Sequence, residues 1–137
     1  MGIIVVFDTN VLFSALWQPP GTPGGLVDAF VAGRVRAAYS ADVFSEYRFV
    51  LFRPDLGLSP VLAARLLEAI QNDGVLVHPQ PVAAVLFPDP ADAVFIAAAL
   101  ATPERALVTG NVKHYPPRLR QGVKVLTPRQ AFERVSL

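Results

Sequence analysis

The stretch Ile3-Ile4-Val5-Val6-Phe7, followed directly by Asp8-Thr9-Asn10, decides the fold class of this chain. An apolar run that is rich in β-branched residues and does not alternate is typical of a strand covered on both faces, as in a parallel sheet with flanking helices. Ligands of such sheets collect at the carboxyl ends of the strands. We therefore expect Asp8 at that edge, where it either caps the helix that follows or binds a cation; the residues alone leave both interpretations open.

Segments typical of strands and of helices alternate along the rest of the chain. Four further strands are predicted at 35–39, 75–77, 105–109 and 123–126. Helices are predicted at 10–17, 26–33, 41–52, 60–72 and 91–101, and after a capping box at 127–130. This order predicts an α/β fold in one domain over 1–137, a layer sandwich whose central, mainly parallel sheet of about five strands is flanked by helices.

Composition excludes several classes of protein. The apolar fraction of 53% fits a sheet that is buried on both faces, and the longest apolar run, from Ala93 to Ala101, is too short to span a membrane. The first residues lack the basic segment of a signal peptide, and Asp8 interrupts the apolar run. We therefore expect a cytoplasmic protein that does not bind membranes.

The chemistry available for a metal site is narrow. There is no cysteine, which excludes disulfides and thiolate ligands, and the two histidines are too few for an all-histidine zinc site. A metal ion would be held mainly by oxygen, which favours Mg²⁺ or Mn²⁺ over Zn²⁺.

The net charge is only +1, but half of the twelve positive side chains fall between residues 113 and 134. These residues are Lys113, Arg118, Arg120, Lys124, Arg129 and Arg134. They are either a solvated surface or a phosphate-binding surface.

Three acidic residues fall where the alternation of strands and helices would bring them together. Asp8 follows the first strand, Glu46 is in the second turn of the helix after the second strand, and Asp92 is in the first turn of the helix before the fourth strand. Asn111 follows the fourth strand as Asp8 follows the first. Carboxylates so close repel one another unless a cation lies between them, and bound Mg²⁺ can clamp phosphate oxygens and activate water.

Each of these residues also has a purely structural interpretation. Asp89, before Pro90, is placed to cap a helix, and Asp92 is placed to complement the helix dipole. Glu46 can pair with a nearby arginine on its own helix, where we expect Val43, Tyr47 and Val50 to share one apolar face. Thr109 is expected to orient Asp8 or a water molecule through its hydroxyl.

Four segments in order along the chain resemble a PIN domain. They are Phe7-Asp8-Thr9-Asn10-Val11-Leu12, Ser45-Glu46-Tyr47, Asp89-Pro90-Ala91-Asp92-Ala93-Val94-Phe95 and Leu107-Val108-Thr109-Gly110-Asn111-Val112-Lys113-His114-Tyr115. The chain is most similar to the bacterial PIN-family toxin components of toxin–antitoxin systems, relatives of the VapC-like toxins. The likeness covers the whole chain and implies a PIN-like three-layer sandwich.

The resemblance implies an endoribonuclease that depends on Mg²⁺ or Mn²⁺, with Asp8, Glu46 and Asp92 as catalytic residues and metal ligands. Asn111, where many PIN domains have a fourth aspartate, is expected to be an auxiliary ligand, which leaves open whether one or two metal ions bind. Asp89, Asn10 and Thr109 are expected around this cluster, and contacts to RNA are expected from Lys113, His114, Arg118 and Arg120. The implied partners are an RNA substrate, a small antitoxin that inserts a segment into the acidic groove, and further copies of the chain in a homodimer or higher assembly.

Two other functions are considered. A PIN fold whose catalysis is weak or lost could be a binding module or scaffold; Asn111 favours this alternative, and the three intact acids oppose it. A phosphoryl-transfer enzyme of the haloacid-dehalogenase or receiver type also places Asp after its first strand, but Asn10 stands where such a site would have its second acid.

Overall fold

The sheet is built from strands that are all parallel. The computed structural model of the chain describes residues 3–17 and 33–135. Within these residues the strands are β1 (Ile3–Phe7), β2 (Val35–Tyr39), β3 (Val75–Leu76), β4 (Ala106–Val108) and β5 (Lys124–Leu126). They form one sheet in the order β3-β2-β1-β4-β5, and each neighbouring pair is parallel. The predicted α/β fold with a five-stranded parallel sheet is confirmed.

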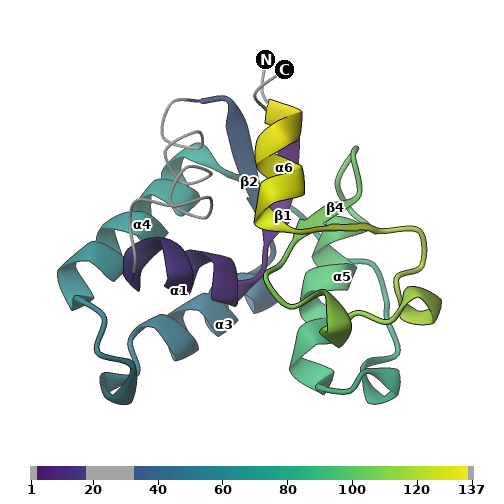
Figure 1. Ribbon diagram of the computed structural model, residues 1–137, viewed down its shortest axis with the longest axis horizontal. Helices are drawn as coiled ribbons and strands as arrows, with labels where there is room; N and C mark the ends of the chain where they lie inside the picture. The colour runs from purple at the N-terminus through teal and green to yellow at the C-terminus, as the bar shows by residue number, and fades with distance from the viewer. Residues whose placement is uncertain (1–2, 18–32, 136–137) are drawn as a thin grey trace.

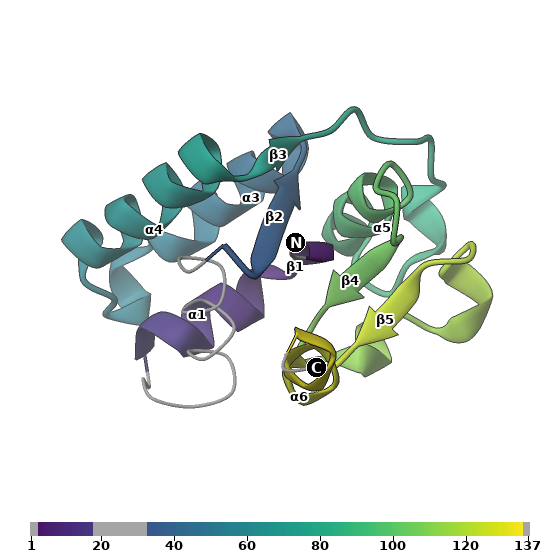
Figure 2. The ribbon, with the colours of Figure 1, turned by 90° about the horizontal axis from the view of Figure 1, so that it is seen from above.

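Helices cover both faces of this sheet. They are α1 (Thr9–Trp17), α3 (Ala41–Leu51), α4 (Pro60–Asp73), α5 (Ala93–Ala99) and α6 (Pro128–Val135) (Figure 1). In Figure 2, α1 and α4 lie on one side of the sheet and α5 lies on the other. None of the helices in the described part of the chain has the length and apolar character needed to cross a membrane. The helix predicted at 26–33 lies outside the described residues.

Local hydrogen bonds explain where the helices begin. Ser40 accepts a bond from the backbone N–H of Val43 at the start of α3, and Ser59 does the same for Leu62 at the start of α4. The capping box predicted before the last helix is confirmed: Thr127 Oγ1 accepts from the backbone N–H of Gln130, whose side chain accepts from the backbone N–H of Thr127.

Two details of the predicted helices are wrong. The helix expected over 91–101 is α5 over 93–99, because the Asp89 carboxylate accepts a bond from the backbone N–H of Ala91 and closes a separate 3-10 turn, η3 (Pro90–Asp92). On α3 the fully buried stripe runs through Val43, Tyr47 and Leu51, and Val50 is only half-buried, because a strict four-residue spacing continues along the face toward the sheet.

The sheet has its topological switch point beside β1. The chain proceeds from β1 to β2 and β3 on one side, and then crosses back so that β4 pairs with the other side of β1. The backbone N–H of Asp8 donates to the Val108 carbonyl at 2.8 Å, which extends this pairing one residue past the strand. Asp8 and Thr109 therefore lie next to each other just beyond the carboxyl ends of β1 and β4. Crevices at such points are where open α/β sheets bind ligands.

Candidate active site

Asp8 is held by hydrogen bonds on both of its carboxylate oxygens. Its side chain is buried, and Oδ1 accepts from the backbone N–H of Thr9 at 2.8 Å. Oδ2 accepts from the hydroxyls of Thr109 and Tyr115, each at 2.8 Å, and from Asn10 Nδ2 at 3.3 Å. Burial raises the pKa of Asp8, and these hydrogen bonds oppose that rise. Asp8 thus lies at the start of α1. The three side chains that donate to its Oδ2 take no part in a helix cap, so capping does not explain these hydrogen bonds.

Asn10 ties the ends of β1 and β4 together. Its Nδ2 also donates to Thr109 Oγ1 at 3.3 Å, and its Oδ1 accepts from the backbone N–H of Gly110 at 2.8 Å. A Cβ atom on Gly110 would lie 3.2 Å from Asn10 Oδ1, so the glycine allows this close approach. Thr109 is fully buried, and its hydroxyl also accepts from the backbone N–H of Asn111 at 3.0 Å. The structure therefore places Asn10 and Thr109 directly around Asp8.

Glu46 and Asp92 lie close enough to Asp8 for their charges to interact. The pKa of Glu46 is raised by partial burial and by the carboxylates of Asp89 and Asp8. Burial, followed by the charges of Asp8 and Asp89, raises the pKa of Asp92 to about 6, while His114 lowers it. Asp92 is 8% exposed and makes no capping bond to α5, so the helix-dipole interpretation does not account for its burial. Acids from three separate segments thus form one electrostatically coupled cluster.

His114 links Asp92 to Asn111. Its Nδ1 lies 3.2 Å from Asp92 Oδ2, and its Nε2 lies 3.0 Å from Asn111 Nδ2. This pattern matches the tautomer that carries its proton on Nδ1. The contact with Asp92 is electrostatic, because Asp92 Oδ2 has no hydrogen-bond partner of acceptable geometry among the described residues. Asn111 is an exposed side chain at the rim of the cluster.

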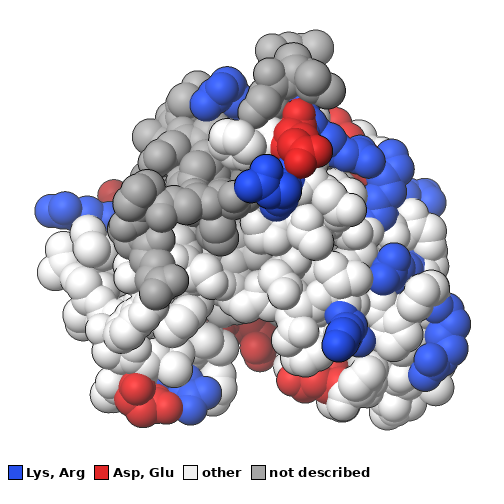
Figure 3. All heavy atoms as spheres, viewed as in Figure 1, with Lys and Arg blue, Asp and Glu red and all other residues white. Residues whose placement is uncertain are grey.

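The basic residues expected to contact RNA do not all play the same part. Lys113 and Arg118 are exposed, whereas Arg120 is half-buried and its Nε donates to the Tyr115 carbonyl at 2.8 Å. Figure 3 shows acidic atoms in a hollow at the lower centre of one face, and lysine and arginine side chains gathered over the C-terminal part of the chain to its right. The positive surface thus lies beside the acidic hollow.

The acidic cluster fits a divalent cation in its chemistry. Its donors are carboxylate oxygens, which Mg²⁺ and Mn²⁺ prefer. Burial raises the pKa values of Asp8, Glu46 and Asp92, and repulsion by neighbouring carboxylates raises those of Glu46 and Asp92 further. The buried Asp92 Oδ2, which lacks a hydrogen-bond partner within the described residues, is an oxygen that a cation would satisfy. In the same part of the chain no three Asp, Glu or His side chains are gathered closely enough to hold an ion as they stand. An ion bound here would therefore reach some of these carboxylates through water or after they move.

Two buried tyrosines lie near this cluster, and of these Tyr115 is a candidate that the sequence analysis missed. Tyr47 on α3 and Tyr115 after the 3-10 turn η4 (Val112–His114) are both fully buried. The Tyr47 hydroxyl donates to the Phe7 carbonyl, and the Tyr115 hydroxyl donates to Asp8 Oδ2. In sequence, a buried tyrosine is indistinguishable from any other core aromatic residue. The only available signal was the position of Tyr115 in the segment that follows β4.

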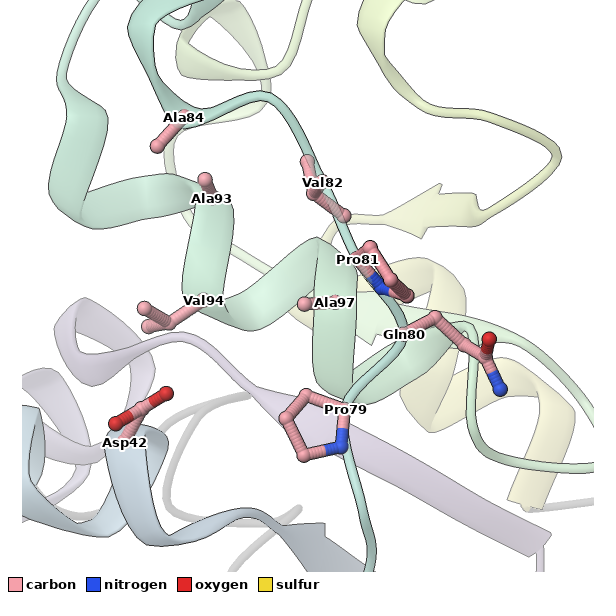
Figure 4. A pocket seen from close by; sticks show the side chains of 9 residues that line it. All are labelled: Asp42, Pro79, Gln80, Pro81, Val82, Ala84, Ala93, Val94 and Ala97. Carbon is pink, nitrogen blue, oxygen red and sulfur yellow. The ribbon is translucent and has the colours of Figure 1, made fainter.

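A groove of about 280 Å³ has a lining that contains none of the three acids Asp8, Glu46 and Asp92. Figure 4 shows it between the first turn of α3, the segment 79–84 and α5. Its lining is Asp42, Pro79, Gln80, Pro81, Val82, Ala84, Ala93, Val94 and Ala97. With a single charged side chain, this lining offers neither a cluster of metal ligands nor a basic surface for phosphate. The candidate active site is therefore the acidic cluster and not this groove.

Comparisons with known proteins agree with this fold. A chain in the crystal structure of VapBC2 from Rickettsia felis, bound to a DNA fragment from its promoter, superposes with a TM-score of 0.61. It is 16% identical in sequence, and the match covers 90% of this chain and 98% of that one. A comparison with curated proteins finds no match. The family model of the PIN domain matches residues 4–113, and the chain therefore belongs to the PIN domain family.

Proposed function

We propose that this protein is an endoribonuclease that depends on Mg²⁺ or Mn²⁺ and uses Asp8, Glu46 and Asp92 as its metal ligands. Membership of the PIN domain family, whose members are generally nucleases, supports the reaction class. The observation that carries the proposal is the electrostatic coupling of three carboxylates at the switch point of the sheet. One buried oxygen of Asp92 has no hydrogen bond among the described residues, and its polar contact is His114 Nδ1 at 3.2 Å. A cluster of this kind is more stable with a cation bound than without one.

A bound divalent cation supplies Lewis acidity toward a phosphate oxygen and lowers the pKa of a coordinated water. The residues of the chain do the rest. Hydrogen bonds from Thr109 and Asn10 fix the position of the Asp8 carboxylate. Glu46 and Asp92 contribute the negative charge that attracts the cation. Asn111, which keeps an amide oxygen but lacks a charge, is proposed as an auxiliary ligand, and Asp89 stays outside because its Oδ1 caps the turn at Ala91.

RNA is proposed to approach across the basic surface beside the hollow. Lys113 and Arg118 are exposed and can contact backbone phosphates, and His114 in the same segment lies 3.2 Å from Asp92 of the acidic cluster. Arg120 already donates through Nε to a backbone carbonyl, so its part in RNA binding falls to its terminal nitrogens. Without a cation the acidic cluster would repel RNA.

We also propose that the protein is the toxin of a type II toxin–antitoxin pair. The structural match is to a chain of VapBC2, a complex that its title describes as bound to promoter DNA. A small antitoxin that places a segment into the acidic hollow would compete with both the cation and the RNA. Co-expression of the gene encoded beside this one tests the proposal: rescue of growth supports it, and continued toxicity with both proteins present contradicts it.

Self-association is proposed through an apolar surface on α1, α3 and α4. Its exposed side chains are Trp17, Phe49, Phe52, Val61 and Leu62. Phe49 alone is 70% exposed, which is unusual for a phenylalanine on a helix that needs no partner. Light scattering at micromolar concentration is expected to give a dimer, and a monomer would contradict this proposal.

Cleavage of a mixed RNA pool tests the reaction directly. We expect the wild type to cleave RNA with Mg²⁺ or Mn²⁺ and not in EDTA, and we expect Glu46→Gln to reduce the rate by at least about a hundredfold, since it removes one ligand charge. Glu68→Gln, an exposed residue on α4, is the matched control and should cleave like the wild type. Cleavage in EDTA, or equal cleavage by Glu46→Gln, would contradict the proposed function, and metal binding without any cleavage would favour an inactive binding module.

A further inference from the structure

The two oxygens of the Asp8 carboxylate have very different surroundings. Oδ2 accepts three hydrogen bonds, from Tyr115, Thr109 and Asn10, whereas Oδ1 accepts only the bond from the backbone N–H of Thr9. An ionised carboxylate oxygen has about two good lone-pair directions. Oδ2 is therefore saturated, and Oδ1 is the oxygen that retains a lone pair for another ligand.

Burial and two backbone hydrogen bonds fix the position of Tyr115, whose hydroxyl donates to Asp8 Oδ2. Its ring is fully buried, its backbone N–H donates to the Val112 carbonyl at 3.0 Å, and its carbonyl accepts from Arg120 Nε at 2.8 Å. Both contacts fix the backbone on either side of the ring. Burial and the neighbouring carboxylates also raise the pKa of Tyr115, so the hydroxyl keeps its proton and remains a donor.

We infer that Tyr115 is a positioning residue, whose hydroxyl occupies Asp8 Oδ2 and so leaves Oδ1 as the oxygen that binds a divalent cation. This inference rests on the proposed function. Groups that hydrogen-bond a metal ligand typically change metal affinity or activity by 10–100-fold when they are removed. Tyr115 lies in the segment that follows β4, which also carries basic residues. Its hydrogen bond therefore connects this segment to Asp8, which follows β1.

Tyr47 provides a matched control for this inference. It is also fully buried beside the end of β1 and donates one hydrogen bond, but to the Phe7 carbonyl instead of the Asp8 carboxylate. Tyr115→Phe and Tyr47→Phe therefore remove the same atom from equally buried rings. Only the first variant changes a hydrogen bond to a proposed metal ligand.

The test measures the Kd for Mn²⁺ by calorimetry, the kcat and KM for RNA, and the urea unfolding midpoint of each variant. Tyr115→Phe is expected to raise the Kd for Mn²⁺ and to lower kcat by about 10-fold or more, with the KM for RNA changed less than about threefold. Tyr47→Phe is expected to shift the unfolding midpoint while its Kd for Mn²⁺ stays within about twofold of the wild type.

If Tyr115→Phe does not fold, Thr109→Val and Thr109→Ser probe the same oxygen from the other side. The valine variant removes the hydroxyl that binds Asp8 Oδ2 and should raise the Kd for Mn²⁺, whereas the serine variant retains a hydroxyl and should restore the affinity. An unchanged Kd in Tyr115→Phe, an equal loss in Tyr47→Phe, or equal affinities of the two Thr109 variants would overturn the inference alone. A wild type that binds no Mn²⁺ would overturn the proposed function, and the inference with it.

Discussion

Replacing Asp92 by asparagine is expected to stabilise the metal-free protein at neutral pH while it abolishes cleavage. Asp92 is buried, and its pKa is raised from the ordinary value of 3.8 to about 6 by burial and by Asp8 and Asp89. The folded protein thus holds an unfavourable charge above pH 6. An amide of nearly the same shape removes that charge and also removes a proposed metal ligand.

The raised pKa of Asp92 sets an upper limit on this gain in the free energy of unfolding. A tenfold change in proton affinity corresponds to about 1.4 kcal/mol, so the rise in the pKa of Asp92 limits the gain in the free energy of unfolding to about 3 kcal/mol. Burying an amide with incomplete hydrogen bonding costs roughly 1–3 kcal/mol and offsets part of it. We expect a net gain of about 1 kcal/mol above pH 6.

The upward direction of the Asp92 pKa shift determines the pH range in which this gain in stability appears. Between pH 3.8 and about 6 the folded state keeps the proton on Asp92 and the unfolded state loses it, so this residue makes the wild type less stable as pH rises through the window. Urea unfolding in EDTA from pH 4 to 8 should therefore show the advantage of Asp92→Asn growing up to about pH 6 and constant above it. Glu68→Gln should show no such trend. A difference between Asp92→Asn and the wild type that does not change with pH would refute the reasoning.

Four further substitutions have specific expected outcomes. Gly74→Ala places a Cβ atom 2.3 and 2.4 Å from two backbone carbonyl oxygens, so we expect a loss of at least about 3 kcal/mol in the free energy of unfolding, measured by urea denaturation. Gly110→Ala pushes its Cβ to 3.2 Å from Asn10 Oδ1 and should cost about 1 kcal/mol by the same measurement, with a lower kcat on RNA. Lys113→Ala and Arg118→Ala should each weaken RNA binding and lower the slope of log K against log salt by about 1, measured by fluorescence anisotropy; unchanged slopes would contradict the phosphate contacts.

The order of strands and helices was predictable because each strand is a short apolar run closed by a turn or a cap. The run at 3–7 and the capping box at 127–130 are local signals, and the structure follows them. The late start of α5 at Ala93 was not predictable in the same way, because in sequence Asp89 is placed as the cap and Asp92 as a first-turn acid of one continuous helix. Only the structure shows that Asp89 caps a separate turn and Asp92 is buried.

The acids of the site could be predicted, but not the groups that hold them. Asp8 follows from the rule that polar residues after parallel strands lie at one edge of the sheet. Glu46 and Asp92 follow from their places in the helices that connect these strands. The contact of Tyr115 with Asp8 joins residues 107 positions apart and depends on β4 lying beside β1, which no local pattern encodes. The bond from Arg120 Nε to the Tyr115 carbonyl joins residues only five apart, but they directly follow 3-10 turns without a regular side-chain period, so the sequence predicts only a contact of Arg120 to RNA.

The most direct test of the central claim is calorimetric titration of Mn²⁺ into the wild type and into Asp8→Asn at pH 7.5. The central claim is that the cluster around Asp8 binds a divalent cation. We expect the wild type to bind Mn²⁺ and Asp8→Asn to bind at least about tenfold more weakly. The variant loses a ligand charge and keeps one oxygen, which the Tyr115 and Thr109 hydroxyls hold, so an amide nitrogen replaces the oxygen proposed to bind the cation. Equal Kd values for the two proteins, or no binding by the wild type, would contradict the claim.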